Sequence, residues 1–507
     1  MDGGPSESAR LAVLIAGAAI VVFLGGVSQN HTTSTPGSLP SAEKLIQLVM
    51  RDLEAEEKAA GELDEYVRGQ VSQAWVYLGR DSLAIESAQP GSEFWRAINL
   101  AGVVQTQARL TGQALSSADL AALSVPEENA WLLPLSIAEG FLESGHIGDA
   151  RKALESVPVN RGTLPSVIRV LLRISQHLQD DGSIDGVREL LPQAAKHVED
   201  NSLHPTEELH LAMLTRLAMQ SRQRDIAERF RRQTIAVSDK QNQNDSSITT
   251  PYPVYATMQA ALASFEVGDV SESRQRIDLA IQQCGHITTG SNDPDHDLRE
   301  RAATLEQLAR RLHEFGHPAE ALRCLELGAG YALKLERGFG RDAKLRKLTV
   351  AAHDLSHHEL ADQFEAHIES SSWKLIALRD QVERLRLSGR TVEARKKLFT
   401  AESLLPSILE PSSPSGEIAE LGAAWTRLGD GTRGHEHFQR ALRLSEQNDQ
   451  SNHQSIARLQ IKTGLLNDAF ATAQQMIERK YRIIPLTELA VAAATQQFEQ
   501  QQASKIR

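Results

Sequence analysis

Helix-forming segments separated by short turns occupy most of the chain. Apolar residues never show the sustained two-residue alternation of Val, Ile and Thr that is typical of strands, so the sequence predicts no sheet. Each segment instead ends at a turn residue, and a carboxylate or small residue about four positions later leads into the next segment. The clearest copies read Gly145-His-Ile-Gly-Asp149-Ala150, Gly316-His-Pro-Ala-Glu320-Ala321, Gly389-Arg-Thr-Val-Glu393-Ala394 and Gly464-Leu-Leu-Asn-Asp468-Ala469.

The turn residues recur at a nearly constant period, mostly 33 to 40 residues, with the two longest intervals around Gly268. Such self-similarity indicates stacked hairpins of two helices each. Glycine accepts the left-handed backbone that ends a helix, and a carboxylate in the first turn of the next helix meets its unpaired N–H groups. We call these turn residues anchors. They are Gly79, Gly112, Gly145, Gly182, Arg222, Gly268, Gly316, Ser356, Gly389, Gly429 and Gly464.

Small residues lie seven positions before several anchors, and the Gly429 unit adds Phe438 nine positions and Ala441 twelve positions after its anchor. The small residues are Ala138, Ala261, Ala309, Gly422 and Ala457. With these residues the chain resembles the tetratricopeptide repeat (TPR) family over roughly residues 60–495. The family's early tryptophan is mostly missing. The resemblance implies an all-α fold, a right-handed α-solenoid of about eleven degenerate hairpins; a generic helical-hairpin solenoid is the alternative.

Residues 11–27 form an uncharged apolar run that, as a helix, just crosses a bilayer core of roughly 30 Å. Only Arg10 precedes the run against two carboxylates, and Gly25-Gly-Val27 is a poor cleavage site. An uncleaved signal anchor is therefore favoured over a cleaved signal peptide. We expect a tail at 1–10, a transmembrane anchor at 11–27, a flexible linker at 28–40, a repeat domain at 41–495 and a disordered tail at 496–507. The repeat domain is expected outside the cytoplasm, or secreted if cleavage occurs.

The composition is that of a soluble folded protein over most of its length, with 41% apolar and 24% charged residues. The formal net charge of −12 argues against nucleic acid as a partner, because phosphate binding needs a basic surface. Two cysteines, Cys284 and Cys324, lie at different depths of their second helices. The offset is about 12 Å along a helix, too far for an unstrained disulfide, so two free thiols are expected.

Three motifs resemble metal sites. His313-Glu-Phe-Gly-His317 matches the zincin signature, which needs both histidines on one continuous helix. Gly316 is an anchor, so the repeat predicts a helix break inside the motif. His353 and His357 likewise flank the turn at Ser356. Asp293-Pro-Asp295-His-Asp297 begins like a calcium loop but lacks its glycine and final glutamate, so an inter-repeat loop is expected. We expect no metal and no cofactor.

The resemblance to TPR proteins implies a binding groove lined by first-helix positions before each anchor. In this chain the groove would combine an apolar patch with a partly basic stripe, suited to a protein or peptide that carries carboxylates. The candidate residues are Tyr255, Met258, Phe265, Arg310, His313, Arg346, His353, Arg379, Glu383 and Arg386.

The sequence thus predicts a membrane-tethered, extracytoplasmic scaffold that binds protein or peptide partners without catalysis. Two alternatives remain open: an envelope enzyme or enzyme subunit that uses the His-rich region 313–358, and a peptide-sensing regulator.

Overall fold

The computed structural model of the chain is helical throughout the residues that it describes. These are residues 39–60, 64–114, 123, 125–160, 162–200, 209–244, 250–291, 293–408, 415–445 and 450–506. The anchor expected at 11–27 and nearly all of the linker expected at 28–40 lie outside them. Among the described helices, none is both long enough and apolar enough to cross a membrane.

The chain divides into two compact units, residues 63–411 and residues 1–62 together with 412–507. The larger unit holds α3 (Glu65–Tyr77), α4 (Asp81–Ala88), α5 (Glu93–Thr111), η2 (Glu127–Asn129), α7 (Leu132–Glu143), α8 (Ile147–Glu155), α9 (Leu164–Asp180), α10 (Ile184–Asp200), α11 (Leu209–Gln220), α12 (Arg224–Asn244), α13 (Tyr252–Glu266), α14 (Val270–Gly285), α15 (Pro294–Glu314), α16 (Pro318–Ala332), α17 (Phe339–Asp354), α18 (His358–Ala366), α19 (Ser371–Leu387), α20 (Thr391–Ser403) and α21 (Leu405–Ile408). The smaller unit holds α2 (Ala42–Ala60), α22 (Ser415–Arg427), α23 (Gly431–Ser445), α24 (Gln450–Lys462), α25 (Leu466–Gln474) and α26 (Arg479–Ile506).

All eleven predicted anchors have a positive φ, which confirms the repeat assignment. Arg222 and Ser356, the two that are not glycine, have φ values of 62° and 64°. At every anchor except Gly112, the residue after the anchor donates its N–H to the carbonyl of the residue four positions before the anchor. At Gly145, for example, His146 donates to Phe141 at 2.8 Å. This bond closes the first helix and turns the chain into the second. Gly112 makes the simpler bond, from its own N–H to the Ala108 carbonyl.

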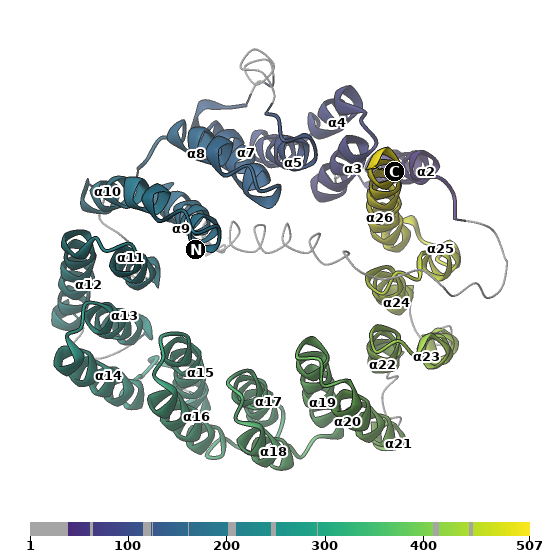
Figure 1. The fold of residues 1–507 in the computed structure, drawn as a ribbon. Coiled ribbons are helices and arrows are strands. Elements are labelled where there is room, and N and C mark those ends of the chain that lie inside the picture. The colour runs from purple at the N-terminus through teal and green to yellow at the C-terminus, as the bar shows by residue number, and fades with distance from the viewer. Residues whose placement is uncertain are drawn as a thin grey trace. The chain divides into compact units, whose positions relative to one another are not determined.

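Small residues allow the two helices of each hairpin to approach closely. Ala138, Ala261 and Ala309 before the anchors, and Ala150 and Ala321 after them, are all fully buried. In the larger unit, the first helices from α7 to α19 lie along one side and the second helices from α8 to α20 along the other (Figure 1). Two hydrophobic clusters run between them, one over residues 76–267 and one over residues 212–377.

The smaller unit contains a hairpin made from the two ends of the described chain. Helix α26 packs on α24 and α25 as the next first helix of the array, and α2 packs along α26 (Figure 1). The Asp52 carboxylate, almost fully buried on α2, accepts hydrogen bonds from the Arg482 guanidinium at 2.9 and 2.6 Å. The Leu39 N–H also donates to the Asn467 side-chain oxygen at 3.1 Å.

Two further expectations can be compared with the structure. A disordered tail was expected from residue 496, but α26 continues to Ile506. Its last turns consist mainly of Gln, Ala, Glu and Lys, which have good helix propensity. Cys284 and Cys324 are both buried free thiols, as predicted. Burial raises the pKa of Cys324 to about 12 and raises that of Cys284 as well, so neither thiol is activated.

Candidate binding surfaces

Ion pairs connect successive first helices of the larger unit. We call this contact line the first-helix seam. Arg346 on α17 reaches Asp380 on α19 at 2.7 Å, and Asp354 on α17 accepts from Arg310 on α15 and, at 2.9 Å, from Arg384 on α19. The same kind of contact recurs elsewhere in the unit. The other pairs are Arg109–Glu143 at 3.5 Å, Arg169–Glu139 at 3.0 Å and Arg216–Glu266 at 2.8 Å.

Of the three apolar side chains predicted to line the groove, Met258 is excluded by its burial. Met258 is 1% exposed and lies in the hydrophobic core, and Tyr255 packs against the same cluster. Burial raises the pKa of Tyr255 to about 12, as expected for a phenol removed from water. Phe265 is half-buried, with its ring edge-on to that of His317 at a centroid distance of 4.2 Å. These side chains hold neighbouring hairpins together, because their helix face is turned toward the next repeat.

The basic part of the predicted groove is engaged in contacts within the chain. Arg310 pairs with Glu306 on its own helix and with Asp354 on the next first helix. Arg346 pairs with Asp380, and its guanidinium lies 5.8 Å from the Trp373 ring centroid. These two arginines therefore already have carboxylate partners.

The rest of the predicted stripe lies on α19. Arg386 makes a two-bond fork with Glu383 at 2.8 and 3.0 Å, and Arg379 is half-buried on the same helix. The sequence placed these residues on the first helices correctly. It did not reveal that carboxylates of the chain itself occupy most of the arginines.

The structure divides the histidines of the His-rich region among four successive helices, α15 to α18, or their N-caps. The zincin-like motif is broken as predicted: His313 is exposed near the end of α15, whereas His317 is buried at the N-cap of α16. Burial lowers the pKa of His317. His353, predicted to line the groove, is instead buried against the His358 ring at 4.5 Å. Within the described part of the chain, no three His, Cys, Asp or Glu residues form a group that could hold a metal ion.

The calcium-like segment is not the inter-repeat loop that the sequence predicts: Asp293 is the N-cap of α15, and Pro294 to Asp297 form the first turn of that helix, because proline is favoured at the first helical position and carboxylates are favoured in the first turn. Asp293 caps α15 by accepting from the Asp295 N–H at 2.9 Å, and it also pairs with Arg299. Asp297 accepts from the Thr289 backbone N–H at 2.8 Å and from the Thr289 hydroxyl at 2.7 Å. Internal hydrogen bonds thus account for two of the three carboxylates of the motif, and they keep the pKa values of Asp293 and Asp297 low.

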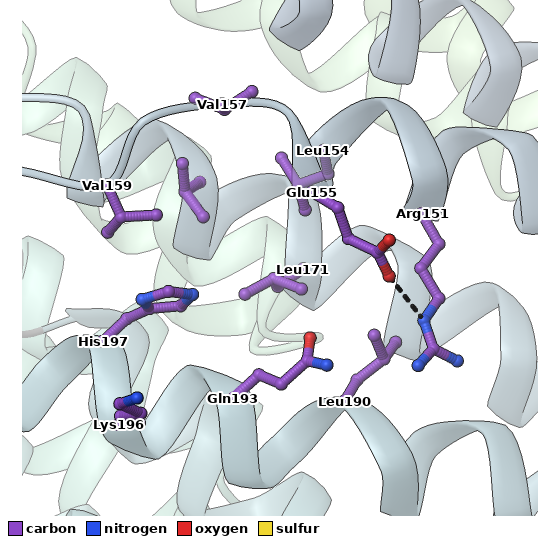
Figure 2. Close-up of a pocket in the computed structure, with 11 residues that line it drawn as sticks. Arg151, Leu154, Glu155, Val157, Val159, Leu171, Leu190, Gln193, Lys196 and His197 are labelled. Atoms are coloured by element: carbon purple, nitrogen blue, oxygen red, sulfur yellow. Dashed lines mark ion pairs between the residues drawn. The ribbon is translucent and has the colours of Figure 1, made fainter.

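A cleft of about 670 Å³ lies between α8, α9 and α10 (Figure 2). Helix α8 has 9 residues, whereas α10 has 17, so the second half of α10 extends beyond α8. The chain leaves α8 through Val157-Pro158-Val159, which passes along the top of the cleft in Figure 2. The floor is purely aliphatic and nearly buried. It consists of Leu154, Val157, Val167, Leu171 and Leu190.

The rim of the cleft is polar. Gln193, Lys196 and His197 lie on one face of α10, because they are three and four residues apart. At the opposite end, Arg151 pairs with Glu155 at 3.5 Å and with Glu189 on α10 at 2.8 Å. In Figure 2 His197 and Lys196 lie at one end of the cleft, the Arg151–Glu155 pair at the other, and Gln193 between them.

Sequence reasoning missed this cleft because it considered only the first helices. The second helices carry only a weak signal: Pro158 follows the end of α8 closely, but Pro192 lies inside α10, so prolines alone do not show which of the two helices is longer. Unequal second helices in adjacent hairpins leave part of the longer helix uncovered.

No model of a known protein family matches the sequence, and no curated protein does. Solved structures are similar in fold only. Ton1535 from Thermococcus onnurineus NA1 is 13% identical over 70% of this chain and 98% of its own, with a TM-score of 0.29. Yeast Tom70 is 10% identical over 79% of this chain and 93% of its own, with a TM-score of 0.25. The TPR domain of P58(IPK) is 14% identical over 73% of this chain and 98% of its own, with a TM-score of 0.17.

With scores this low, the fold assignment rests on the paired helices and their turn geometry. The chain is an all-α array of TPR-like helical hairpins.

Proposed function

We propose that the protein is a scaffold that binds protein partners and performs no chemistry of its own. The main support is the array itself: hairpins with a repeated turn geometry whose first helices are joined by partly buried ion pairs. Such an array presents a long surface of fixed side-chain positions, and solenoid repeats bind partners with surfaces of this kind. The chain's charge of −12 disfavours nucleic acid as the partner.

Membrane attachment through residues 11–27, with the repeats outside the cytoplasm, is part of the same proposal. It is supported by the uncharged apolar run and the polar segment after it. N-terminal sequencing of the protein recovered from the membrane fraction tests it. An intact N-terminus supports the anchor. A new terminus near Ser28 in a soluble extract would replace the anchor with secretion.

Partner binding is tested by photo-crosslinking in the native cell. A photoreactive residue replaces His313 on the first-helix side or Gln193 on the second-helix side, both of which are exposed. We expect each position to yield a small, reproducible set of crosslinked proteins. Val170, buried on α9, is the control position and should yield none. If neither exposed position, nor further positions along the array, gave a specific product, the scaffold proposal would be wrong.

A further inference from the structure

We propose that the cleft between α8, α9 and α10 binds a linear peptide segment in which an aliphatic side chain lies next to a carboxylate. This inference rests on the proposed scaffold function and identifies one of its binding sites. The site lies among second helices, away from the first-helix side where the sequence predicts a groove. Its volume of about 670 Å³ falls within the range of roughly 300–1,000 Å³ that is typical of ligand pockets.

The floor defines the buried part of the ligand. Its leucines and valines offer no hydrogen-bonding side-chain atom and no aromatic ring. Leu171 and Leu190 are 5% and 1% exposed, so the base of the cleft is shielded from water. A branched aliphatic side chain, which needs no polar partner, is the matching group for an apolar base.

The rim defines the charge of the ligand. No described residue forms an ion pair with Lys196, which is exposed. Glu199, one turn further along α10, gives both carboxylate oxygens to Arg229 on α12, and this bond lowers its pKa. At the far end, Glu155 faces Arg151. The ammonium of Lys196 therefore offers a site for a carboxylate from outside the chain.

The spacing of the rim groups favours a peptide over a single-headed amphiphile. Gln193 lies between the two charged ends, and its side-chain amide has both a donor and an acceptor. A peptide backbone offers the complementary C=O and N–H at each residue. A fatty acid has one polar head and would leave Gln193 without a partner. We therefore assign the cleft to a peptide with its aliphatic side chain on the floor and its carboxylate near Lys196.

The test is a selection from a phage-displayed library of random twelve-residue peptides on the full-length protein in lipid nanodiscs. Wild-type protein should enrich peptides in which Leu, Ile or Val adjoins Asp or Glu. Lys196→Glu should weaken the binding of these peptides by about tenfold, which is the effect of losing one charge-assisted hydrogen bond. The same variant should enrich peptides that carry Lys or Arg at the acidic position.

Two further variants complete the design. Gln193→Trp places a bulky ring over the cleft from an exposed position and should abolish the selection. Lys152→Glu on α8 makes the same charge change outside the cleft, at a side chain that is 80% exposed, and should change nothing. Circular dichroism confirms that each variant is folded.

The inference is overturned if wild type and Gln193→Trp select the same peptides, or if Lys196→Glu leaves the charge preference unchanged. Either result leaves the scaffold proposal intact, since the selected peptides would then bind elsewhere on the array. Binding of dodecanoate with no peptide selected would make the cleft a lipid site and would also overturn the assignment. By contrast, if the crosslinking experiment in the cell gave no specific partner at any exposed position, the scaffold proposal itself would be wrong.

Discussion

The two sides of the larger unit join neighbouring hairpins in different ways. Carboxylates of the first-helix seam are sheltered: Glu139, Glu266 and Asp354 have side chains 15–19% exposed. Those that connect second helices are mostly open to water, with Glu189, Asp278 and Asp362 at 64–66%. Glu365, at 11%, is the exception. Sheltered pairs are less screened and contribute more to stability, so the first-helix seam holds the array together while the second-helix side can remain open.

The largest expected effect comes from the tightest contact on the first-helix side. A Cβ at Gly140 on α7 would lie 2.3 Å from the Gln105 carbonyl oxygen of α5. Gly140→Ala should therefore lower the free energy of unfolding by about 2 kcal/mol, because overpacking against backbone outweighs the higher helix propensity of alanine.

Urea unfolding followed by circular dichroism measures this loss. Gly148→Ala on α8 is the control, since nothing lies within 4 Å of the added carbon, and it should not destabilise the protein. Equal stability of the two variants would mean that the first helices are not packed as closely as the structure shows.

The second prediction compares the two kinds of ion pair directly. Asp354→Ala removes the carboxylate that Arg310 and Arg384 share at a sheltered site and leaves Arg310 paired with Glu306 alone. It should lower the free energy of unfolding by about 1.5 kcal/mol. Asp278→Ala removes the exposed partner of Arg323 between second helices and should cost less than about 0.5 kcal/mol. Urea unfolding at low and high salt measures both. If the two variants lost the same free energy of unfolding, the distinction between the first-helix seam and the ion pairs of the second helices would be wrong.

The third prediction concerns the turns that connect the two sides. Ser356 adopts the left-handed conformation with φ of 64°, which strains a residue that carries a Cβ. Ser356→Gly should therefore stabilise the protein by about 1 kcal/mol, visible as a higher Tm. The reverse change at an equivalent turn, Gly389→Ser, should lower the Tm by a similar amount. A lower Tm for Ser356→Gly would contradict the shared turn geometry.

The smallest effect is a pH dependence of stability at the start of one second helix, α16. Burial holds the pKa of His317 below its unfolded value of about 6.5. The unfolded chain therefore binds a proton more readily, so stability is full above about pH 6.5 and declines as the pH falls through the folded-state pKa. When the pH is lowered from 7.5 to 5.5, the Tm of His317→Phe should fall by less than the Tm of the wild-type protein. The matched change at exposed His313 should leave the wild-type pH dependence in place. Parallel curves for His317→Phe and wild type would contradict this assignment.

Repeat spacing predicted the fold because turn geometry is a local property. A residue in the left-handed conformation followed by the first turn of a helix is determined by only a few neighbouring residues. The repeat spacing therefore located even Arg222 and Ser356, the two anchors that are not glycine. The binding surface was not predicted in the same way. Whether Arg310 is open to a ligand depends on Asp354, 44 residues away, and the cleft depends on how far α8 falls short of α10. Both are properties of contacts between repeats, which one repeat does not encode.

The pairing of α2 with α26 has a consequence for synthesis on the ribosome. Asp52 and Arg482 are 430 residues apart, so α2 emerges long before the helix that covers it. At roughly 5–20 residues per second, the delay is roughly 20 to 90 s. During that interval Leu45, Ile46, Val49 and Leu53, all buried in the finished protein, lack their final partner. The smaller unit therefore completes its folding only after α26 has emerged, and a chain truncated before α26 leaves this apolar face exposed to chaperones and proteases.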